Sequence, residues 1–324
     1  MKILVTGITG LFGSYLAREF LNLGELHGLR RKNSQLNLLR DLSDRIIWHE
    51  GDINDYHSLE ETFDMMDLIV HAAGLVSYDS KDIDRLNEVN VEGTANVVNA
   101  MLQKKIKNLV YISSVAALGR SPDTSVIDEN HKWTSSPLNS PYGISKYLAE
   151  LEVWRGAQEG LKVMIFNPSV LLGKITDQRS SAAIYQYVLQ EKRYYPLGSI
   201  NYLDVRDAAQ LIVQIYQKNR WNERFILSNE SMPYQKFFQT MANVLQKKAP
   251  HVPVSGLMLH LAFIWLGINR VFNRKKIPLN RQTARLAQGS IVFDNQKATE
   301  LTGFKYTSLE STFAWARGTE SNFA

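Results

Sequence analysis

The chain has 324 residues, of which 44% are hydrophobic and 21% charged, and it contains no cysteine. This composition is that of a globular protein, and it excludes disulfides, thiolate chemistry and long disordered regions. The net charge is +5, but the basic residues occur in small scattered groups, so they indicate solvated surface rather than a nucleic-acid-binding face. Gly7 and Gly10 interrupt the first apolar run too early for a secretory signal, and we expect a cytoplasmic protein.

The first 170 residues alternate between short apolar runs and segments with helical periodicity. Strands are expected at 2–7, 25–30, 46–53, 67–74, 108–114 and 162–169, and helices at 11–24, 58–66, 90–105 and 140–160. Ser58 is a plausible N-cap for the second of these helices. The strands are apolar throughout, as expected when helices cover both faces of a sheet. This alternation predicts an α/β fold with a Rossmann-type doubly wound parallel sheet.

The pattern changes after about residue 170. Helices are expected at 182–190 and 234–248 and a strand at 223–228, which predicts a smaller, mainly helical C-terminal substrate lobe. We assign residues 1–170 to a dinucleotide-binding domain with a returning segment around 203–228, and residues 171–202 and 229–324 to the lobe.

The strongly apolar run from Val252 to Phe272 belongs to this second part. His260, Asn269 and Arg270 interrupt it, so that it is marginal for a bilayer span. We interpret it as a buried or pocket-lining helix. A helix lying weakly on a membrane surface, helped by the basic residues at 274–276, is the alternative, and a transmembrane helix is the least favoured reading.

Three glycines, Gly7, Gly10 and Gly13, lie between the first expected strand and the first expected helix. In a dinucleotide-binding turn, the first glycine permits the tight turn, the second lets the backbone approach a pyrophosphate, and the third lets the helix pack against the strand. The helix N-terminus then offers free N–H groups to the phosphate. A glycine-rich loop without a ligand is the alternative, which the βαβ context disfavours.

Further motifs follow the glycine turn in a characteristic order. "TGITGLFG" matches TGxxGxxG, and it is followed by "GDIND", "HAAG", "NVEGTANV", "YISSVAALG", "YGISK", "FNPSVLLG" and "NYLDVRDAA". Over about residues 1–215 the chain resembles the extended branch of the short-chain dehydrogenase/reductase superfamily, of the NAD-dependent epimerase/dehydratase type. It looks closest to members similar to dihydroflavonol 4-reductases and 3β-hydroxysteroid dehydrogenases, although Asn167 stands where the family usually has arginine. Beyond about residue 230 the resemblance is loose.

The end of the second strand, "HGLRRKNS", bears on the choice of cofactor. Members that prefer NAD carry an acidic residue where Arg31 stands, and a guanidinium can instead bind a 2′-phosphate in bidentate fashion. With Arg30 or Ser34 assisting, this favours NADP(H), and NAD(H) stays the alternative, in which Arg31 is a surface residue. No metal is expected. The resemblance implies further cofactor contacts from Thr6, Leu11, Phe12, Asp52, Ile53, Ala72, Ala73, Gly74, Asn90, Asn167, Pro168 and Ser169.

"YGISK" places Tyr142 and Lys146 four residues apart on one face of a helix. A nearby ammonium favours the ionised phenol and moves its pKa toward the working pH of an acid/base catalyst. The pair alone is a weak signal, and it gains weight because Ser113 and Ser114 end the preceding strand. Either serine could polarise the substrate oxygen, and we favour Ser114. The resemblance also assigns Lys146 to the nicotinamide ribose.

These residues predict an NADP(H)-dependent oxidoreductase that interconverts a carbonyl and an alcohol on a small, apolar substrate. A nucleotide-sugar 4-epimerase or dehydratase with bound NAD is one alternative. A non-catalytic NADP-binding regulatory protein is another, although such relatives commonly lack the Tyr/Lys pair. Tyr78, Tyr185 and Tyr202 are candidates for lining the substrate pocket. A homodimer through the helices containing "NVVNAML" and "YLAELEV" is common in the superfamily and is a candidate assembly here that the sequence does not prove, whereas a nucleic-acid partner is not expected.

Overall fold

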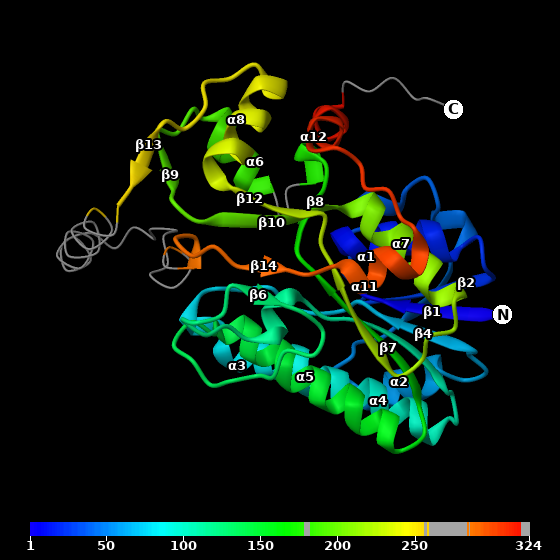
Figure 1. Ribbon diagram of the computed structural model, residues 1–324. Coiled ribbons are helices and arrows are strands. Elements are labelled where there is room, and N and C mark those ends of the chain that lie inside the picture. Colours follow the sequence, from blue (N-terminus) through cyan, green and yellow to red (C-terminus); the bar gives the residue numbers. More distant parts are fainter. Residues whose placement is uncertain (178–181, 256–257, 259–283, 285, 319–324) are drawn as a thin grey trace.

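A seven-stranded parallel sheet forms the centre of the molecule. The computed structural model describes residues 1–177, 182–255, 258, 284 and 286–318 (Figure 1). The strands of the sheet are β1 (Lys2–Thr6), β2 (Glu25–Arg30), β3 (Ile47–Glu50), β4 (Leu68–His71), β5 (Asn108–Ile112), β7 (Lys162–Pro168) and β11 (Glu223–Leu227). Their order is β11-β7-β5-β4-β1-β2-β3, which is the doubly wound arrangement with its switch point between β1 and β4. The predicted α/β fold is confirmed.

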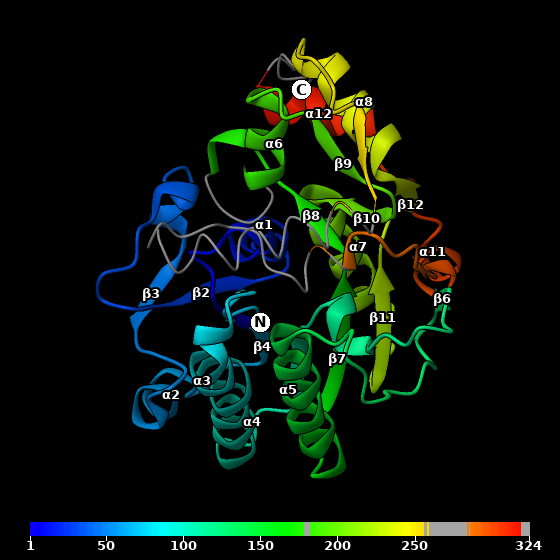
Figure 2. The same cartoon turned by 90° about the vertical axis from the view of Figure 1, so that its left-hand side faces the viewer.

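Helices cover both faces of this sheet (Figures 1 and 2). One face carries α1 (Leu11–Phe20), α7 (Val205–Gln217) and α11 (Gln296–Thr302), and the other carries α2 (Tyr56–Thr62), α4 (Gly93–Gln103) and α5 (Pro141–Gln158). Successive strand residues therefore enter different cores, and all are fully buried: Ile3 and Val5 lie on the α1 side, and Leu4 on the α4 side. This double burial explains why the strands are apolar throughout.

Some helix boundaries differ from the sequence-based expectation. Helix α2 begins at Tyr56 because the Asp55 side chain, and not Ser58, caps it by accepting the His57 N–H. Ser58 instead donates to the backbone carbonyl of Asp52 at 3.1 Å. Helix α7 was not expected at all, although its N-cap, Asp204, is the first aspartate of the motif "NYLDVRDAA".

The returning segment also ties the two parts of the chain together. Asp204, 1% exposed, caps α7 by accepting the Arg206 N–H at 2.8 Å. Its second oxygen accepts the Thr312 hydroxyl at 2.9 Å. Thr312 lies on α12 (Leu309–Arg317), a helix of the smaller lobe. One buried carboxylate thus joins the lobe to the helix that packs against α1.

The smaller lobe contains more strands than expected. Beside α6 (Ala182–Leu189), α8 (Tyr234–Leu245) and α12 it holds the strands β8 (Val170–Leu172), β9 (Tyr194–Pro196), β10 (Ser199–Asp204), β12 (Glu230–Pro233) and β13 (Val252–Val254). They form a three-stranded sheet, β12-β10-β8, and a parallel pair, β13-β9. Segments of three to six residues are too short for a clear periodicity, so the description "mainly helical" was incomplete.

The apolar run that begins at Val252 does not start as a helix. Val252–Val254 form strand β13, paired with Tyr194–Pro196. The remainder of the predicted helix, apart from residues 255 and 258, lies outside the described residues. Within the part of the chain that the structure describes, no helix is long and apolar enough to cross a bilayer.

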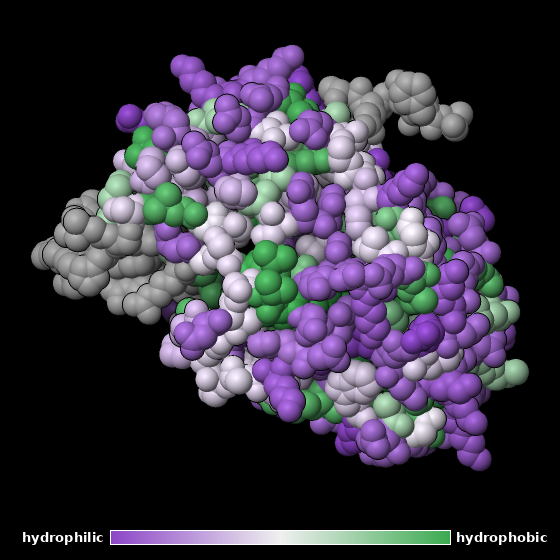
Figure 3. Space-filling view, viewed as in Figure 1, coloured by the Kyte–Doolittle hydropathy of each residue, from purple (hydrophilic) through white to green (hydrophobic). Residues whose placement is uncertain are grey.

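Among the apolar side chains that reach the surface, two groups lie close together on one element or strand pair. Strands β6 (Val126–Ile127) and β14 (Val292–Phe293) form a short parallel pair, where Val126 and Val292 point outward and produce an apolar patch (Figure 3). On α5, one of the two helices expected to form a homodimer, Ile144, Leu148 and Leu151 are exposed. The homodimer stays a prediction.

Candidate active site

The glycine turn connects β1 to α1 as the motif predicts. Gly7 has φ +67°, and a Cβ there would lie 2.5 Å from the Ala73 nitrogen. A Cβ on Gly13 would lie 2.2 Å from the Gly7 carbonyl oxygen. Gly7 is therefore required where the turn packs against the loop after β4, and Gly13 is required where α1 packs against the turn.

Gly10 is different because packing does not require it. A Cβ there would meet only the Gly7 carbonyl oxygen, at 3.1 Å, and no side chain caps the N-terminus of α1. Open space above a helix N-terminus is what a pyrophosphate needs. This part of the structure therefore fits a dinucleotide. Leu11 and Phe12 contribute backbone to the first turn of α1, while their side chains pack into the core.

The loop after β4 is held by a chain of polar contacts. Thr6 is fully buried, and its hydroxyl bonds His71 Nδ1 at 2.7 Å and accepts the Ala73 N–H at 3.3 Å. His71 Nε2 contacts the Thr94 hydroxyl at 3.1 Å. Burial, assisted by the charge of Lys146, lowers the pKa of His71 to about 3, so the ring is neutral. The Thr6 side chain thus positions the loop that holds Ala72, Ala73 and Gly74.

Asn90 fixes the same loop from the other side. It lies in the π-helical segment Asn87–Glu92, and its amide accepts the Leu75 N–H at 2.7 Å and donates to the Leu75 carbonyl at 3.0 Å. It also donates to the Ser145 hydroxyl on α5 at 2.9 Å. Asn90 is therefore saturated by protein contacts, and its role is to position the loop.

Lys146 is buried beneath this loop, with only 5% of its surface exposed. Its ammonium donates to the Tyr111 hydroxyl and to the Ile112 carbonyl, both at 2.8 Å. Burial lowers the pKa of Lys146 to about 7, and the nearby carboxylate of Glu150 opposes that shift. Both hydrogen bonds thus go to β5. Tyr111 is a site residue to which the sequence analysis gave no role, although it is the first residue of the motif "YISSVAALG".

Tyr142 and Ser114 lie side by side at the carboxyl end of the sheet. Burial raises the pKa of the Tyr142 phenol, the neighbouring Tyr78 raises it further, and a hydrogen bond with the Ser114 side chain lowers it. The rings of Tyr78 and Tyr142 are 5.8 Å apart in an edge-on arrangement. Lys146 was expected to lower this pKa, and that expectation is wrong, because its charge is not among the causes of the shift. The phenol is therefore protonated near neutrality, and it contacts the serine hydroxyl that was expected to polarise the substrate oxygen.

The buried carboxylate of Glu150 contacts residues that surround Ser114 and Lys146. Glu150 is fully buried one helical turn after Lys146, and it forms an ion pair with Arg224 on β11. It also accepts a hydrogen bond of 2.6 Å from the Asn167 amide, which donates to the Ser114 carbonyl at 2.9 Å. Asn167 replaces the family's usual arginine, and the guanidinium comes here from the neighbouring strand. Glu150 and Arg224 were missed because they are 74 positions apart.

Several buried polar atoms next to these residues have no hydrogen-bond partner within the described part of the chain. They are Ser113 Oγ, Asn167 Oδ1, Ser169 Oγ and Ser228 Oγ. The strand register places them together: Ser113 follows Ile112 beside Phe166, and Pro168 pairs with Leu227. Unpartnered buried polar groups are rare in native proteins. Their presence at this edge fits a polar ligand such as the carboxamide of a nicotinamide.

The end of β2 forms the wall of an open hollow of about 470 Å³. Arg31 is exposed there, and Ser34 accepts its backbone N–H, whereas Arg30 stacks on Trp48. We expected no carboxylate near Arg31, and the structure corrects this, because Glu50, Asp52 and Asp55 also line the hollow. The lining residues are Arg31, Lys32, Asn33, Ser34, Glu50, Gly51, Asp52 and Asp55. Ile53 instead packs inward against Gly93.

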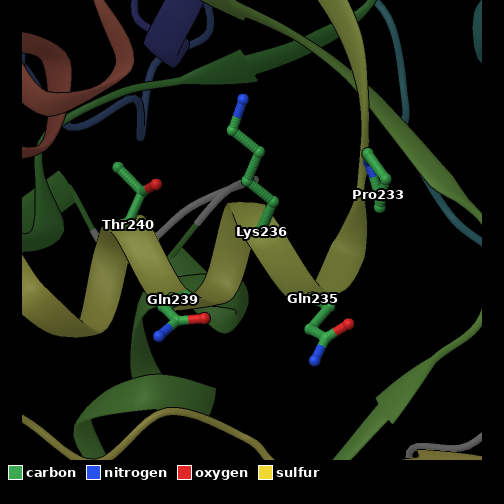
Figure 4. Close-up of a pocket in the computed structure, with 5 residues that line it drawn as sticks. All are labelled: Pro233, Gln235, Lys236, Gln239 and Thr240. Carbon is green, nitrogen blue, oxygen red and sulfur yellow. The ribbon is translucent and has the colours of Figure 1, made fainter.

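Another hollow and two of the proposed lining tyrosines do not belong to this site. A second open hollow of about 470 Å³ lies on α8, and its side chains leave the helix on two sides without converging (Figure 4). Tyr185 and Tyr202 are fully buried in the lobe, where Tyr185 packs on Phe313 and Tyr202 donates to Glu230. Of the three proposed lining tyrosines, only Tyr78 lies beside Tyr142.

Comparisons with known proteins agree with this architecture. The model of the NAD dependent epimerase/dehydratase family matches residues 3–227. A protein of Synechocystis sp. with the name "Putative dihydroflavonol 4-reductase" is 29% identical over 96% of this chain and 92% of its own length. Cinnamoyl-CoA reductase 1 of Oryza sativa subsp. japonica is 30% identical over 69% of this chain and 70% of its own. The crystal structure of gox2253 superposes with a TM-score of 0.83 at 25% identity, covering 97% and 96% of the two chains. The chain therefore belongs to the NAD dependent epimerase/dehydratase family.

Proposed function

We propose that this protein is an NADPH-dependent reductase that converts a carbonyl compound to an alcohol. The observation that carries the proposal is the contact between a protonated phenol, Tyr142, and the hydroxyl of Ser114 at the carboxyl end of a parallel sheet. Ligands of doubly wound sheets bind at this edge, next to the switch point. The similarity to reductases over most of the chain supports the same conclusion.

The residues divide the work as follows. A bound reduced nicotinamide supplies the hydride that adds to the carbonyl carbon. Tyr142 donates its phenolic proton to the carbonyl oxygen, so the two transfers together complete the alcohol. Ser114 donates a hydrogen bond to the same oxygen while negative charge develops on it. Lys146, buried one helical turn after Tyr142 on α5, supplies a positive charge on the same side of that helix when the phenolate forms.

The direct test is NADPH oxidation with a panel of aromatic, steroidal and aliphatic ketones and aldehydes. Consumption of NADPH that depends on a carbonyl compound, with the alcohol recovered in equal amount, supports the reductase. An epimerase would instead retain a stoichiometric NAD through purification and return it unchanged after turnover. Cofactor binding without turnover of any panel member would favour a regulatory protein.

Cofactor preference is expected to depend on Arg31. Its exposed guanidinium lies in the hollow at the end of β2, where a 2′-phosphate would be bound in bidentate fashion. We expect Arg31→Asp to weaken NADPH binding at least tenfold and NADH binding much less, measured by fluorescence titration of both. Lys32→Ala, on the same wall, is the matched control. An unchanged ratio of the two affinities in Arg31→Asp would show that the carboxylates of the hollow, and not Arg31, decide the preference.

A further inference from the structure

Arg120 lies at the end of the turn that begins with Ser114. The turn Val115–Leu118 is followed by Gly119, whose φ of +78° sends the chain past Trp133. The backbone N–H of Arg120 then donates to Asn139 Oδ1 at 2.8 Å, just before α5 begins. The backbone of Arg120 is therefore fixed relative to the elements that carry Ser114 and Tyr142.

The side chain of Arg120 is half-buried between the domain and the lobe. Its Cζ lies 5.7 Å from the ring centroid of Phe293 on β14. Its charge acts on two phenols, Tyr78 beside Tyr142 and Tyr234 at the start of α8, and it lowers the pKa of each against the larger effect of burial. Burial also lowers the pKa of Arg120 itself. The Arg120 guanidinium is thus surrounded by aromatic side chains, one of which, Tyr78, packs against the proposed proton donor.

No carboxylate faces this guanidinium within the described residues. Other arginines of the fold are paired, among them Arg18 with Asp41, Arg206 with Asp204 and Arg224 with Glu150. The segment 259–283, which lies outside the described residues, contains neither aspartate nor glutamate in its sequence. A partly buried cation without a counter-ion loses solvation that no internal interaction replaces.

We propose that Arg120 binds an anionic oxygen group, a carboxylate or a phosphate, on the substrate of this enzyme. A guanidinium presents a planar pair of donors that matches either group. Arg120 ends the turn that begins at Ser114. Its charge acts on Tyr78, whose ring lies 5.8 Å from that of Tyr142, so the acidic group lies on the part of the substrate near the reacting carbonyl. This changes the expectation of a wholly apolar substrate: the inference deepens the proposed reductase function and rests on it.

The test compares substrates that differ only in charge. NADPH oxidation is measured with benzaldehyde, 4-carboxybenzaldehyde and 4-formylphenyl phosphate, for the unmodified protein and for Arg120→Met, Arg120→Lys and Arg40→Met. We expect the unmodified protein to have the higher kcat/KM on one of the two anions. Arg120→Met should reduce the ratio of anionic to neutral kcat/KM at least tenfold, and Arg120→Lys less. Arg40, exposed and bonded to Asn37, is the control, and its variant keeps the original ratio.

Binding separates this inference from the proposed function. The affinities of benzyl alcohol, 4-(hydroxymethyl)benzoate and 4-(hydroxymethyl)phenyl phosphate for the NADP⁺-loaded protein are measured by calorimetry. Loss of anion binding in Arg120→Met and its retention in Tyr142→Phe support the anion site even where no aldehyde is reduced, an outcome that would refute only the reductase. Equal anion binding with and without Arg120, or equal losses for charged and neutral compounds, would overturn the inference.

Discussion

Replacing Tyr142 by phenylalanine is expected to lower the rate of carbonyl reduction by about 10²–10⁴-fold, the usual contribution of a positioned acid. Phenylalanine keeps the ring that packs edge-on against Tyr78 and removes only the hydroxyl that contacts Ser114. NADPH affinity and the thermal unfolding midpoint should therefore stay close to those of the unmodified protein. Single-turnover NADPH oxidation and a fluorescence titration measure the two effects separately.

The direction of the pH dependence follows from the same residue. Since burial raises the pKa of Tyr142, the phenol is protonated at neutral pH and ready to donate in the reduction. The reverse reaction needs the phenolate, so alcohol oxidation should accelerate as the pH rises through the alkaline range. Tyr78→Phe leaves the proton donor in place and should keep turnover, but it removes a group that raises the pKa of Tyr142, so alcohol oxidation should then accelerate at a lower pH. Full activity of Tyr142→Phe would refute the proposed mechanism.

Replacing Glu150 by glutamine is expected to reduce the free energy of unfolding by about 3–5 kcal/mol, the cost of removing one partner from a buried ion pair. Glu150 is fully buried, and its neutral replacement leaves the guanidinium of Arg224, only 17% exposed, without a counter-charge. The double variant Glu150→Leu/Arg224→Met should be more stable than Glu150→Gln, since the Arg224 guanidinium is then no longer left without its counter-charge. Urea denaturation of the three proteins measures this order.

A second measurement distinguishes Glu150 from an ordinary structural residue. The Glu150 carboxylate opposes the lowering of the Lys146 pKa, so Glu150→Gln should move that pKa below its value of about 7. NMR titration of the lysine side-chain signals reports the shift, and Glu152→Gln, on the exposed side of α5, serves as the control. A variant that unfolds like the unmodified protein and titrates with an unchanged pKa would contradict the role given to Glu150.

The doubly wound parallel sheet could be predicted because its signals are local. Each central strand is a short run of consecutive apolar residues, and the glycines at 7, 10 and 13 identify a turn of the type that binds dinucleotides. The strands of the lobe left no such signal, since β8, β9 and β13 have three residues each. Helix α7 was missed because its first residues were assigned only to a family motif.

The site was predictable as a set of residues and not as a network of contacts. Motif spacing identified Ser114, Tyr142 and Lys146, but a helical spacing of four does not determine which atom an ammonium bonds. In the structure Lys146 donates to the Tyr111 hydroxyl and to the Ile112 carbonyl. These contacts depend on how α5 packs against β5, which the spacing of residues along the chain does not determine. Contacts between residues far apart in the chain, such as that of Glu150 with Arg224, require the fold itself.

The neutral imidazole of His71, enclosed between two threonine hydroxyls, sets a limit on acid tolerance. Its pKa in the folded protein is about 3, below the usual 6.5 of an unfolded chain, so only the unfolded form takes up this proton between those values. Above pH 6.5 the group has no effect on stability. Below it, each further pH unit favours unfolding by about 1.4 kcal/mol until the folded ring also titrates. A His71→Gln variant should flatten this part of the profile of unfolding free energy against pH. The contacts of His71 with Thr6 and Thr94, which hold β1 beside β4, would in that case be the reason that the folded protein loses stability in acid.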